Sequence, residues 1–253
     1  MTKTRFIRVS AVMLFAFSLS VAAGSTCRAS QVAATRFSNT GYTINLSGIS
    51  GTQQLTRFWS KLSDSAANPI NSGYGATGAA SGEFRTYCID LYHTITSSAF
   101  NQAAVTVESG LVGDSASPVE HYRDLGKVGW LLNNYDAGVD SGAGWTDSSL
   151  AGLNAGQRAA ALQAAVWVAG YGIASFTTNN SAVTSATNYL LAQLGDHRDY
   201  AGLINYPPPW NGSAGFQSQD MAFAATPEPS SLAIAGLGAL AFAGRASRRR
   251  RMG

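Results

Sequence analysis

One cysteine in the middle of the chain has the surroundings of a reactive thiol. Cys88 lies in the stretch SGEFRTYCIDLYH (residues 81–93), with Asp90 two residues on and His93 five residues on. The only other cysteine in the sequence is Cys27, near the N-terminus. A thiolate is the nucleophilic form of cysteine, and either Asp90 or His93 could move a proton while a bond to sulfur forms or opens. We expect a plainer role for both: Asp90 capping local main chain, and His93 lying on the surface at a strand end.

A glutamine lies in the middle of a second, almost wholly apolar stretch. This stretch, NAGQRAAALQAAVWVAGYG (residues 154–172), has Gln163 near its centre. A helix that is apolar all round is buried, and a buried amide needs hydrogen-bond partners. Nearby main chain can satisfy the amide, or its side-chain carbonyl can be the partner of Cys88.

The segments YCIDL (87–91) and LQAAVW (162–167) resemble the thioester domains of bacterial surface proteins, also called TQXA domains. The intervening GKVGWLLNNY (126–135) is similar to the helix that separates the two motifs in that family, and the resemblance extends weakly over about 41–224. In such domains a strand cysteine and the glutamine of a Thr-Gln-x-Ala motif form an internal thioester with loss of ammonia. The resemblance implies that Cys88 is the thioester cysteine and Gln163 the acyl donor, and Leu162 stands at the threonine position. The supporting residues are Tyr87, Asp90, Ala165 and Trp167, of which the two aromatic residues would exclude water.

Three functions of different classes are consistent with these residues. The first, which we favour, is a covalent adhesin or matrix crosslinker, in which a partner's amine attacks the Gln163 carbonyl and releases Cys88; this reactivity is single-use, so the protein is not an enzyme. The second is a non-covalent structural or exopolysaccharide-associated matrix protein, in which Cys88 is a small buried hydrophobe or pairs with Cys27. The third is a cysteine hydrolase that uses Cys88 and one histidine. We rank it last, because a strand position beside an acid raises a thiol pKa. The candidate histidines are His93, His121 and His197.

The N-terminus has the pattern of a secretory signal peptide, which we place at residues 1–29. Lys3, Arg5 and Arg8 precede the apolar run AVMLFAFSLSVAA (11–23). Cleavage after Ala23 would keep Cys27 in the mature chain, whereas cleavage after Ala29 would remove it.

The C-terminus, TPEPSSLAIAGLGALAFAGRASRRRRMG (226–253), has three parts. The motif Pro227-Glu228-Pro229 comes first, then small and apolar residues over 230–244, which are few for a permanent transmembrane helix. A basic cluster follows that would stay on the cytoplasmic side: Arg245, Arg248, Arg249, Arg250 and Arg251. This ending resembles the PEP-CTERM sorting signal of Gram-negative bacteria. The resemblance implies export through the inner membrane, transient anchoring, processing by an exosortase, and a final place on the cell surface or in a biofilm matrix that contains exopolysaccharide.

The segment between the two ends, residues 30–225, is acidic. It contains eight lysines and arginines against thirteen aspartates and glutamates. This balance argues against a nucleic-acid partner, which requires a basic face. The segment has no phosphate-binding loop and no metal-ligand cluster, so we expect no metal and no cofactor.

The periodicity predicts one α+β domain over 30–225, a β-sandwich or barrel with a helical insertion at about 118–195. Strands are expected at 41–49, at 82–95 and within 212–224, and residues 103–109 are expected to be the hairpin neighbour of 82–95. Helices are expected from Pro118 to Asn133-Asn134, from an Asn154 cap to a stop at Gly170 or Gly172, and from Ser181 to Leu194. Trp59, Trp130 and Trp145 could form a sugar-stacking platform, with Trp145 the best exposed candidate and Trp130 more typical of a core.

Overall fold

The computed structural model describes residues 31–63, 83–91, 104–113, 121–205 and 220–225. The expected signal peptide and sorting segment lie outside these ranges, as do Cys27 and His93. No helix within the described ranges is long and apolar enough to cross a membrane.

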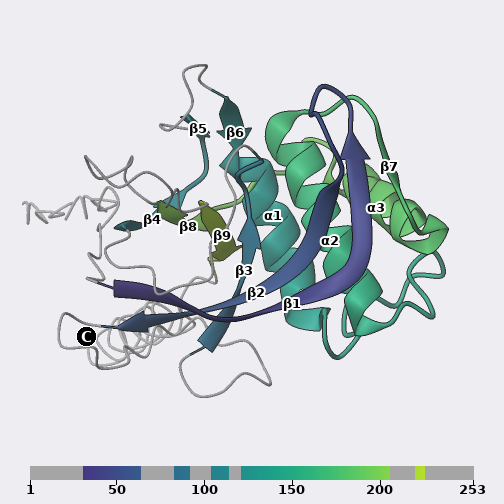
Figure 1. Ribbon diagram of the computed structural model, residues 1–253, viewed down its shortest axis with the longest axis horizontal. Helices are drawn as coiled ribbons and strands as arrows, with labels where there is room; N and C mark the ends of the chain where they lie inside the picture. The colour runs from purple at the N-terminus through teal and green to yellow at the C-terminus, as the bar shows by residue number, and fades with distance from the viewer. Residues whose placement is uncertain (1–30, 64–82, 92–103, 114–120, 206–219, 226–253) are drawn as a thin grey trace, which may run out of the picture.

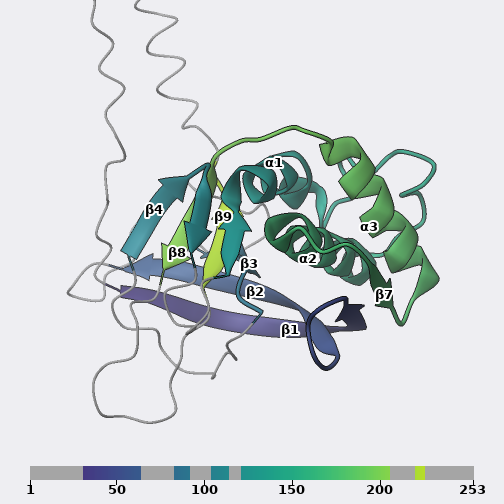
Figure 2. The same cartoon turned by 90° about the horizontal axis from the view of Figure 1, so that it is seen from above.

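Antiparallel pairing joins seven strands into one large sheet (Figure 1). Its order is β4-β8-β9-β3-β2-β1-β7, which places β3 between β9 and β2 near the centre. The sheet bends, so that β8 and β9 run at an angle to the long strands β1 and β2 (Figure 2). The strands are β1 (Gln31–Leu46), β2 (Gln53–Ser63), β3 (Glu83–Cys88), β4 (Ala104–Glu108), β7 (Phe176–Thr178), β8 (Ala201–Asn205) and β9 (Met221–Ala224). A separate two-stranded ribbon consists of β5 (Leu111–Gly113) and β6 (Tyr122–Asp124).

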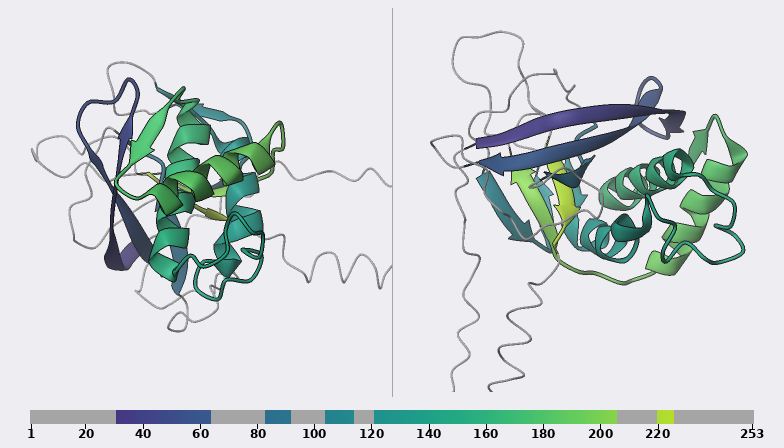
Figure 3. Two further views of the ribbon diagram at one scale, coloured as in Figure 1. Left: turned by 90° about the vertical axis from the view of Figure 1, so that its right-hand side faces the viewer. Right: turned by 90° about the horizontal axis from the view of Figure 1, so that it is seen from below.

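Helices α1 (Leu125–Tyr135) and α2 (Ala155–Tyr171) pack against the sheet, and α3 (Ser181–Leu194) packs on α2 (Figure 3). A short 3-10 helix, η1 (Asp136–Gly138), continues α1. Because α2 contacts strands, α1 and α3, residues 159–170 are all buried, which explains its apolar composition. A Cβ at Gly129 in α1 would meet the Asp199 carbonyl oxygen at 2.4 Å, so glycine permits the close approach of α1 to the start of β8.

Several sequence predictions are confirmed. The chain is α+β with a large antiparallel sheet, and α3 has the expected bounds. Helix α2 begins with a capping box, in which the Asn154 side chain and Gln157 satisfy each other's main-chain N–H groups. It ends at Gly172, which has φ of 64°. A strand does form at β9 within the predicted 212–224, although 212–219 lie outside the described ranges.

The predicted hairpin between 82–95 and 103–109 is wrong. Strand β4 pairs with β8 at the sheet edge, whereas β3 pairs with β2 and β9. The intervening stretch is much longer than the 2–5 residues of a typical hairpin loop, so closeness in sequence did not impose pairing.

The first helix starts later than predicted, at Leu125 rather than Pro118. Tyr122–Asp124 pair with β5 instead, and the Asp124 carboxylate accepts a hydrogen bond from the Lys127 main-chain N–H at 3.3 Å. An N-cap of this kind fixes the first turn. Tyr122 and Leu125 have helical spacing in the sequence, but Tyr122 belongs to β6 and Leu125 begins α1.

The tryptophans do not form a sugar-stacking platform. Trp145 is 3% exposed, and its indole N–H donates to the Tyr135 carbonyl oxygen at 3.0 Å. Trp59 is also buried, beneath the Arg57 guanidinium. Trp130 is half-buried and stacks on His197, with 5.2 Å between the ring centroids. The expectation that Trp145 is exposed is wrong, because its side chain is buried.

A buried ionic cluster fixes β3 to η1. The Asp136 carboxylate accepts from Arg85 Nε at 2.6 Å and from the Tyr87 hydroxyl at 2.7 Å. Arg85 also donates to the Asp136 carbonyl oxygen at 2.6 Å and to the Asp140 carboxylate at 2.6 Å. Removing one member of a buried charge pair leaves the other uncompensated, which is costly.

We therefore expect Asp136→Asn to lower the free energy of unfolding by about 3 kcal/mol, because Arg85 would lose its most buried counter-charge. Urea unfolding followed by tryptophan fluorescence measures this change. The matched control is Asp196→Asn, which neutralises an exposed carboxylate and should change stability by less than about 0.5 kcal/mol. Equal effects of the two substitutions would contradict the role of the cluster.

Candidate functional site

The structure brings the predicted pair together. Cys88 is the last residue of β3 and Gln163 lies in the middle of α2; they are 2% and 1% exposed. The Cys88 main-chain N–H donates to Gln163 Oε1 at 3.1 Å, and Gln163 Nε2 donates to the Cys88 carbonyl oxygen at 2.8 Å. The amide therefore lies against the residue that carries the sulfur.

The Gln163 amide replaces the hydrogen bonds that a longer β2 would make with Cys88. The β2–β3 pairing ends at Phe58↔Thr86, two residues before Cys88. On the other side of β3, the Ile89 main-chain N–H donates to the Asp220 carbonyl oxygen at 3.0 Å. Main-chain groups alternate sides along a strand, so those of Cys88 face the direction that β2 no longer occupies. The Gln163 amide supplies the donor and the acceptor that β2 would otherwise supply.

The Cys88 sulfur is bonded within a tight local turn. Its S–H donates to the Asp90 carbonyl oxygen at 3.0 Å, and the Asp90 N–H approaches the sulfur at 3.4 Å. The alternation predicted for 82–95 is wrong for residues 89–91, because β3 ends at Cys88 and Asp90 is not on the same strand face; residues 92–95 lie outside the described ranges. Asp90 is buried, and its roles in proton movement or in capping stay predictions.

The thiol is held in its neutral form. Burial, the largest effect, raises the pKa of Cys88 well above its ordinary value, and the nearby Asp90 carboxylate raises it further. The main-chain hydrogen bond with Asp90, the Trp167 indole and the charge of Arg123 each lower the pKa, but by less in total. A catalytic thiolate needs the opposite balance, so this environment disfavours the hydrolase.

The aromatic and small supporting residues close the site. Trp167 lies one helical turn after Gln163, on the same face of α2, and is 4% exposed. Its indole N–H has no hydrogen-bond acceptor among the described residues, although it is close enough to the Cys88 sulfur to lower that pKa. Ala165, Leu162 and Tyr87 are also buried, and the Tyr87 hydroxyl is engaged by Asp136.

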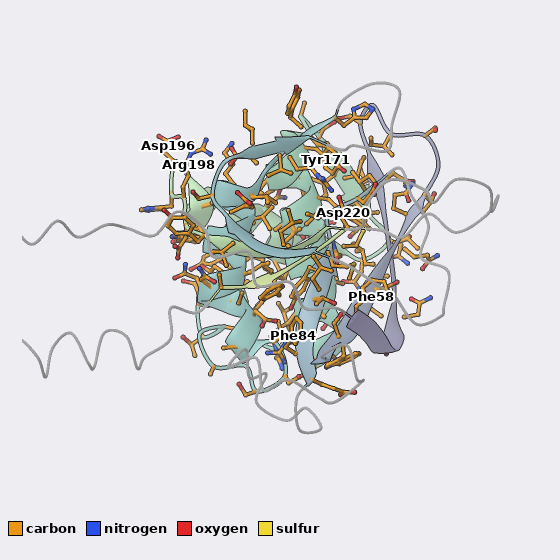
Figure 4. The ribbon with its side chains drawn as sticks, turned by 90° about the vertical axis from the view of Figure 1, so that its left-hand side faces the viewer. Phe58, Phe84, Tyr171, Asp196, Arg198 and Asp220 are labelled. Carbon is orange, nitrogen blue, oxygen red and sulfur yellow. The ribbon has the colours of Figure 1, made fainter. Side chains whose placement is uncertain are left out.

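Two further residues hold the chain just after Cys88, and sequence analysis missed both. The Tyr171 hydroxyl donates to the Ile89 carbonyl oxygen at 2.9 Å and accepts from the Leu91 N–H at 3.2 Å. Asp220 bonds Ile89 through its carbonyl oxygen and pairs with buried Arg123 at 2.8 Å through its carboxylate. Figure 4 labels Tyr171 and Asp220, which both contact the main chain of Ile89. Tyr171 continues the four-residue spacing of Gln163 and Trp167, and that signal could have found it.

The histidines do not complete a catalytic pair in the described ranges. The Cys88 sulfur hydrogen-bonds with the Asp90 main chain. His197 stacks on Trp130, and His121 lines a surface pocket beside Tyr171. Among the described residues, no group of three or more His, Cys, Asp or Glu side chains could hold a metal ion.

Comparison with known protein families agrees with these features. Residues 85–195 match the family model described as "Thioester domain", and residues 225–250 match the "PEP-CTERM protein-sorting motif". Cys88 and Gln163 both fall in the first match, and Pro227-Glu228-Pro229 in the second. No curated protein and no solved structure matches the chain. The two matches support an exosortase-sorted surface protein with a region similar to a thioester domain, and the sorting motif implies export to the cell surface.

The raised pKa of Cys88 predicts a pH-dependent stability in a chain that cannot form the thioester. A thiol whose pKa is higher in the folded state stabilises that state fully below its ordinary pKa of about 8.5, and this contribution is lost as pH rises toward the folded pKa. We expect the free energy of unfolding of Gln163→Ala to fall above about pH 8.5, by up to about 1.4 kcal/mol per pH unit.

Urea titrations across this pH range measure the effect, with the double variant Cys88→Ser/Gln163→Ala as the control without a thiol. The difference between the two variants isolates Cys88 from the buried tyrosines. Parallel pH profiles would contradict the buried neutral thiol.

Proposed function

We propose that this protein attaches covalently to an amine-bearing partner through an internal thioester between Cys88 and Gln163. The observation that carries the proposal is the two-point hydrogen bonding of the Gln163 amide to the Cys88 main chain. The thioester-domain match over both residues adds independent support.

Bond formation follows from this arrangement. The Cys88 sulfur attacks the side-chain carbonyl carbon of Gln163, and the Cys88 N–H, which already donates to Oε1, stabilises the negative charge that develops on that oxygen. The carbon–nitrogen bond breaks, and the thiol proton leaves with the amide nitrogen as ammonia. The products are one thioester and one ammonia, with no oxidant or cofactor consumed.

Attachment reverses the roles of the groups. A neutral primary amine attacks the thioester carbon, the carbon–sulfur bond breaks, and one amine proton passes to sulfur. The result is an amide between Gln163 and the partner, plus a free Cys88 thiol. Because the glutamine is consumed, each molecule reacts once and the protein is not an enzyme.

The surroundings suit a stored reactive bond. Cys88, Gln163 and Trp167 are at most 4% exposed, so water has little access to a thioester there. The Cys88 main chain aligns the amide, and Leu162, at the threonine position of the family motif, packs in the core, so we expect the amide to be oriented without a threonine hydroxyl.

The sorted location supplies the partners. Exosortase would process the tail after transient anchoring by 230–244, leaving the acidic domain on the cell surface or in an extracellular matrix. An amine-bearing surface protein or matrix component, including exopolysaccharide, is the covalent target. The alternative is a non-covalent matrix protein, in which the buried, neutral Cys88 is inert.

Thiol accessibility in the unfolded, unreduced chain separates these two functions. In the full chain carrying Cys27→Ser, we expect Cys88 to resist iodoacetamide in denaturant because its sulfur is bonded, and we expect the additional substitution Gln163→Ala to make it fully alkylated. Gln157→Ala, which removes another glutamine from the same helix, is the matched control and should leave Cys88 protected. Full alkylation of Cys88 in the parent protein would refute the covalent function.

A further inference from the structure

A surface pocket lies beside Tyr171, whose hydroxyl bonds the main chain directly after Cys88. It has a volume of about 490 Å³, within the range of about 300–1,000 Å³ typical of small-molecule sites. Three segments line it: the β1–β2 turn, β6 with its preceding residue, and the end of α2. The lining residues are Ser47, Gly48, Ile49, His121, Tyr122, Tyr171, Gly172, Ile173 and Ala174.

Tyr171 connects this pocket to the candidate thioester. Its side chain lines the pocket, and its hydroxyl bonds the main chain of Ile89 and Leu91, directly after Cys88. Helical side chains lean toward the helix N-terminus, so the Tyr171 ring leans toward the turn of α2 that carries Trp167, one turn after Gln163. Cys88 and Gln163 are themselves buried, so an amine must reach them past a neighbouring group.

The chemistry of the lining defines what can bind. Among the residues that the structure describes, no lysine, arginine, aspartate or glutamate lines the pocket, and the polar groups there are hydroxyls, an imidazole and main chain. Tyr122 is 54% exposed and presents an amphipathic ring to a ligand. A carboxylate there would hold an incoming amine as ammonium, whereas a lining without one does not oppose formation of the neutral amine that can attack.

We propose that this pocket admits the amine to the thioester, and that it selects a primary amine carried on an uncharged, hydroxyl-rich ring such as an amino sugar, which would displace Tyr171 from Ile89 and Leu91. This inference rests on the proposed thioester and adds its entry route and substrate class. A polyamine would bring a second charge into a lining whose described residues offer no counter-charge, so it fits the pocket poorly.

The test uses the full chain carrying Cys27→Ser and two probes, glucosamine and methylamine. Rates of amide formation at Gln163 are measured by mass spectrometry for the parent, for Ala174→Trp and for Ala151→Trp. Ala174 is an exposed residue of the pocket lining, and Ala151 is an exposed alanine in a turn outside it. We expect Ala174→Trp to lower the ratio of glucosamine rate to methylamine rate about tenfold, and Ala151→Trp to leave that ratio at the parent value.

A measurement on the unsubstituted pocket accompanies the variants. N-acetylglucosamine has the same ring without a free amine, and it should compete with glucosamine but not accelerate release of the thiol. Two results overturn the pocket proposal while the thioester stands. The first is an unchanged ratio of glucosamine rate to methylamine rate in Ala174→Trp, and the second is glucosamine labelling that excess N-acetylglucosamine does not slow. The rates of spermidine and glucosamine with the parent are both expressed relative to the rate of a Gly-Lys-Gly peptide. A higher relative rate for spermidine than for glucosamine overturns the substrate class. A parent chain whose mass shows no loss of ammonia removes the thioester itself, and the pocket's role with it.

Discussion

Two hydrogen bonds between the Gln163 amide and the Cys88 main chain are the constraint on which this structure depends. An unpaired amide at the centre of a buried helix would cost about 1–3 kcal/mol for each lost partner. Strand β3 also needs hydrogen-bond partners for the main chain of Cys88, because its pairing with β2 stops before that residue. The helix and the strand therefore satisfy each other, and in doing so they hold the Gln163 amide against the residue that carries the sulfur.

The groups around this contact hold the strand end from several sides. Asp136 binds Arg85 and Tyr87 just before Cys88, while Asp220 and Tyr171 bind Ile89 just after it. Each of these links uses a buried or half-buried polar group, which a fold tolerates only when the group is paired. Burial also raises the pKa of Cys88, so in the proposed reaction the thiol must lose its proton as the sulfur–carbon bond forms, and orientation of the two groups must offset the low nucleophilicity of the neutral thiol.

The features of the fold and site that could be predicted from the sequence are mainly those set by residues close together in the chain. Asn154, Gln157 and Gly172 mark the ends of α2 through their own main-chain geometry, and the sequence was sufficient there. Strand partners are set by distant segments, so β9 and β8 displaced the hairpin expected for 103–109. Trp145 lies among polar residues yet is buried, because its indole bonds the end of α1. The Cys88–Gln163 pair was predictable from paired motifs, whereas the pocket depends on three segments that only the fold brings together.

The most direct test of the central claim is the intact mass of the full chain, purified without reductant and carrying Cys27→Ser. A thioester requires a mass one ammonia below the value calculated from the sequence, restored to the value of an amide adduct by methylamine attached at Gln163. A mass equal to the calculated value would show that Cys88 and Gln163 are hydrogen-bonded neighbours without a covalent bond, and would contradict this account.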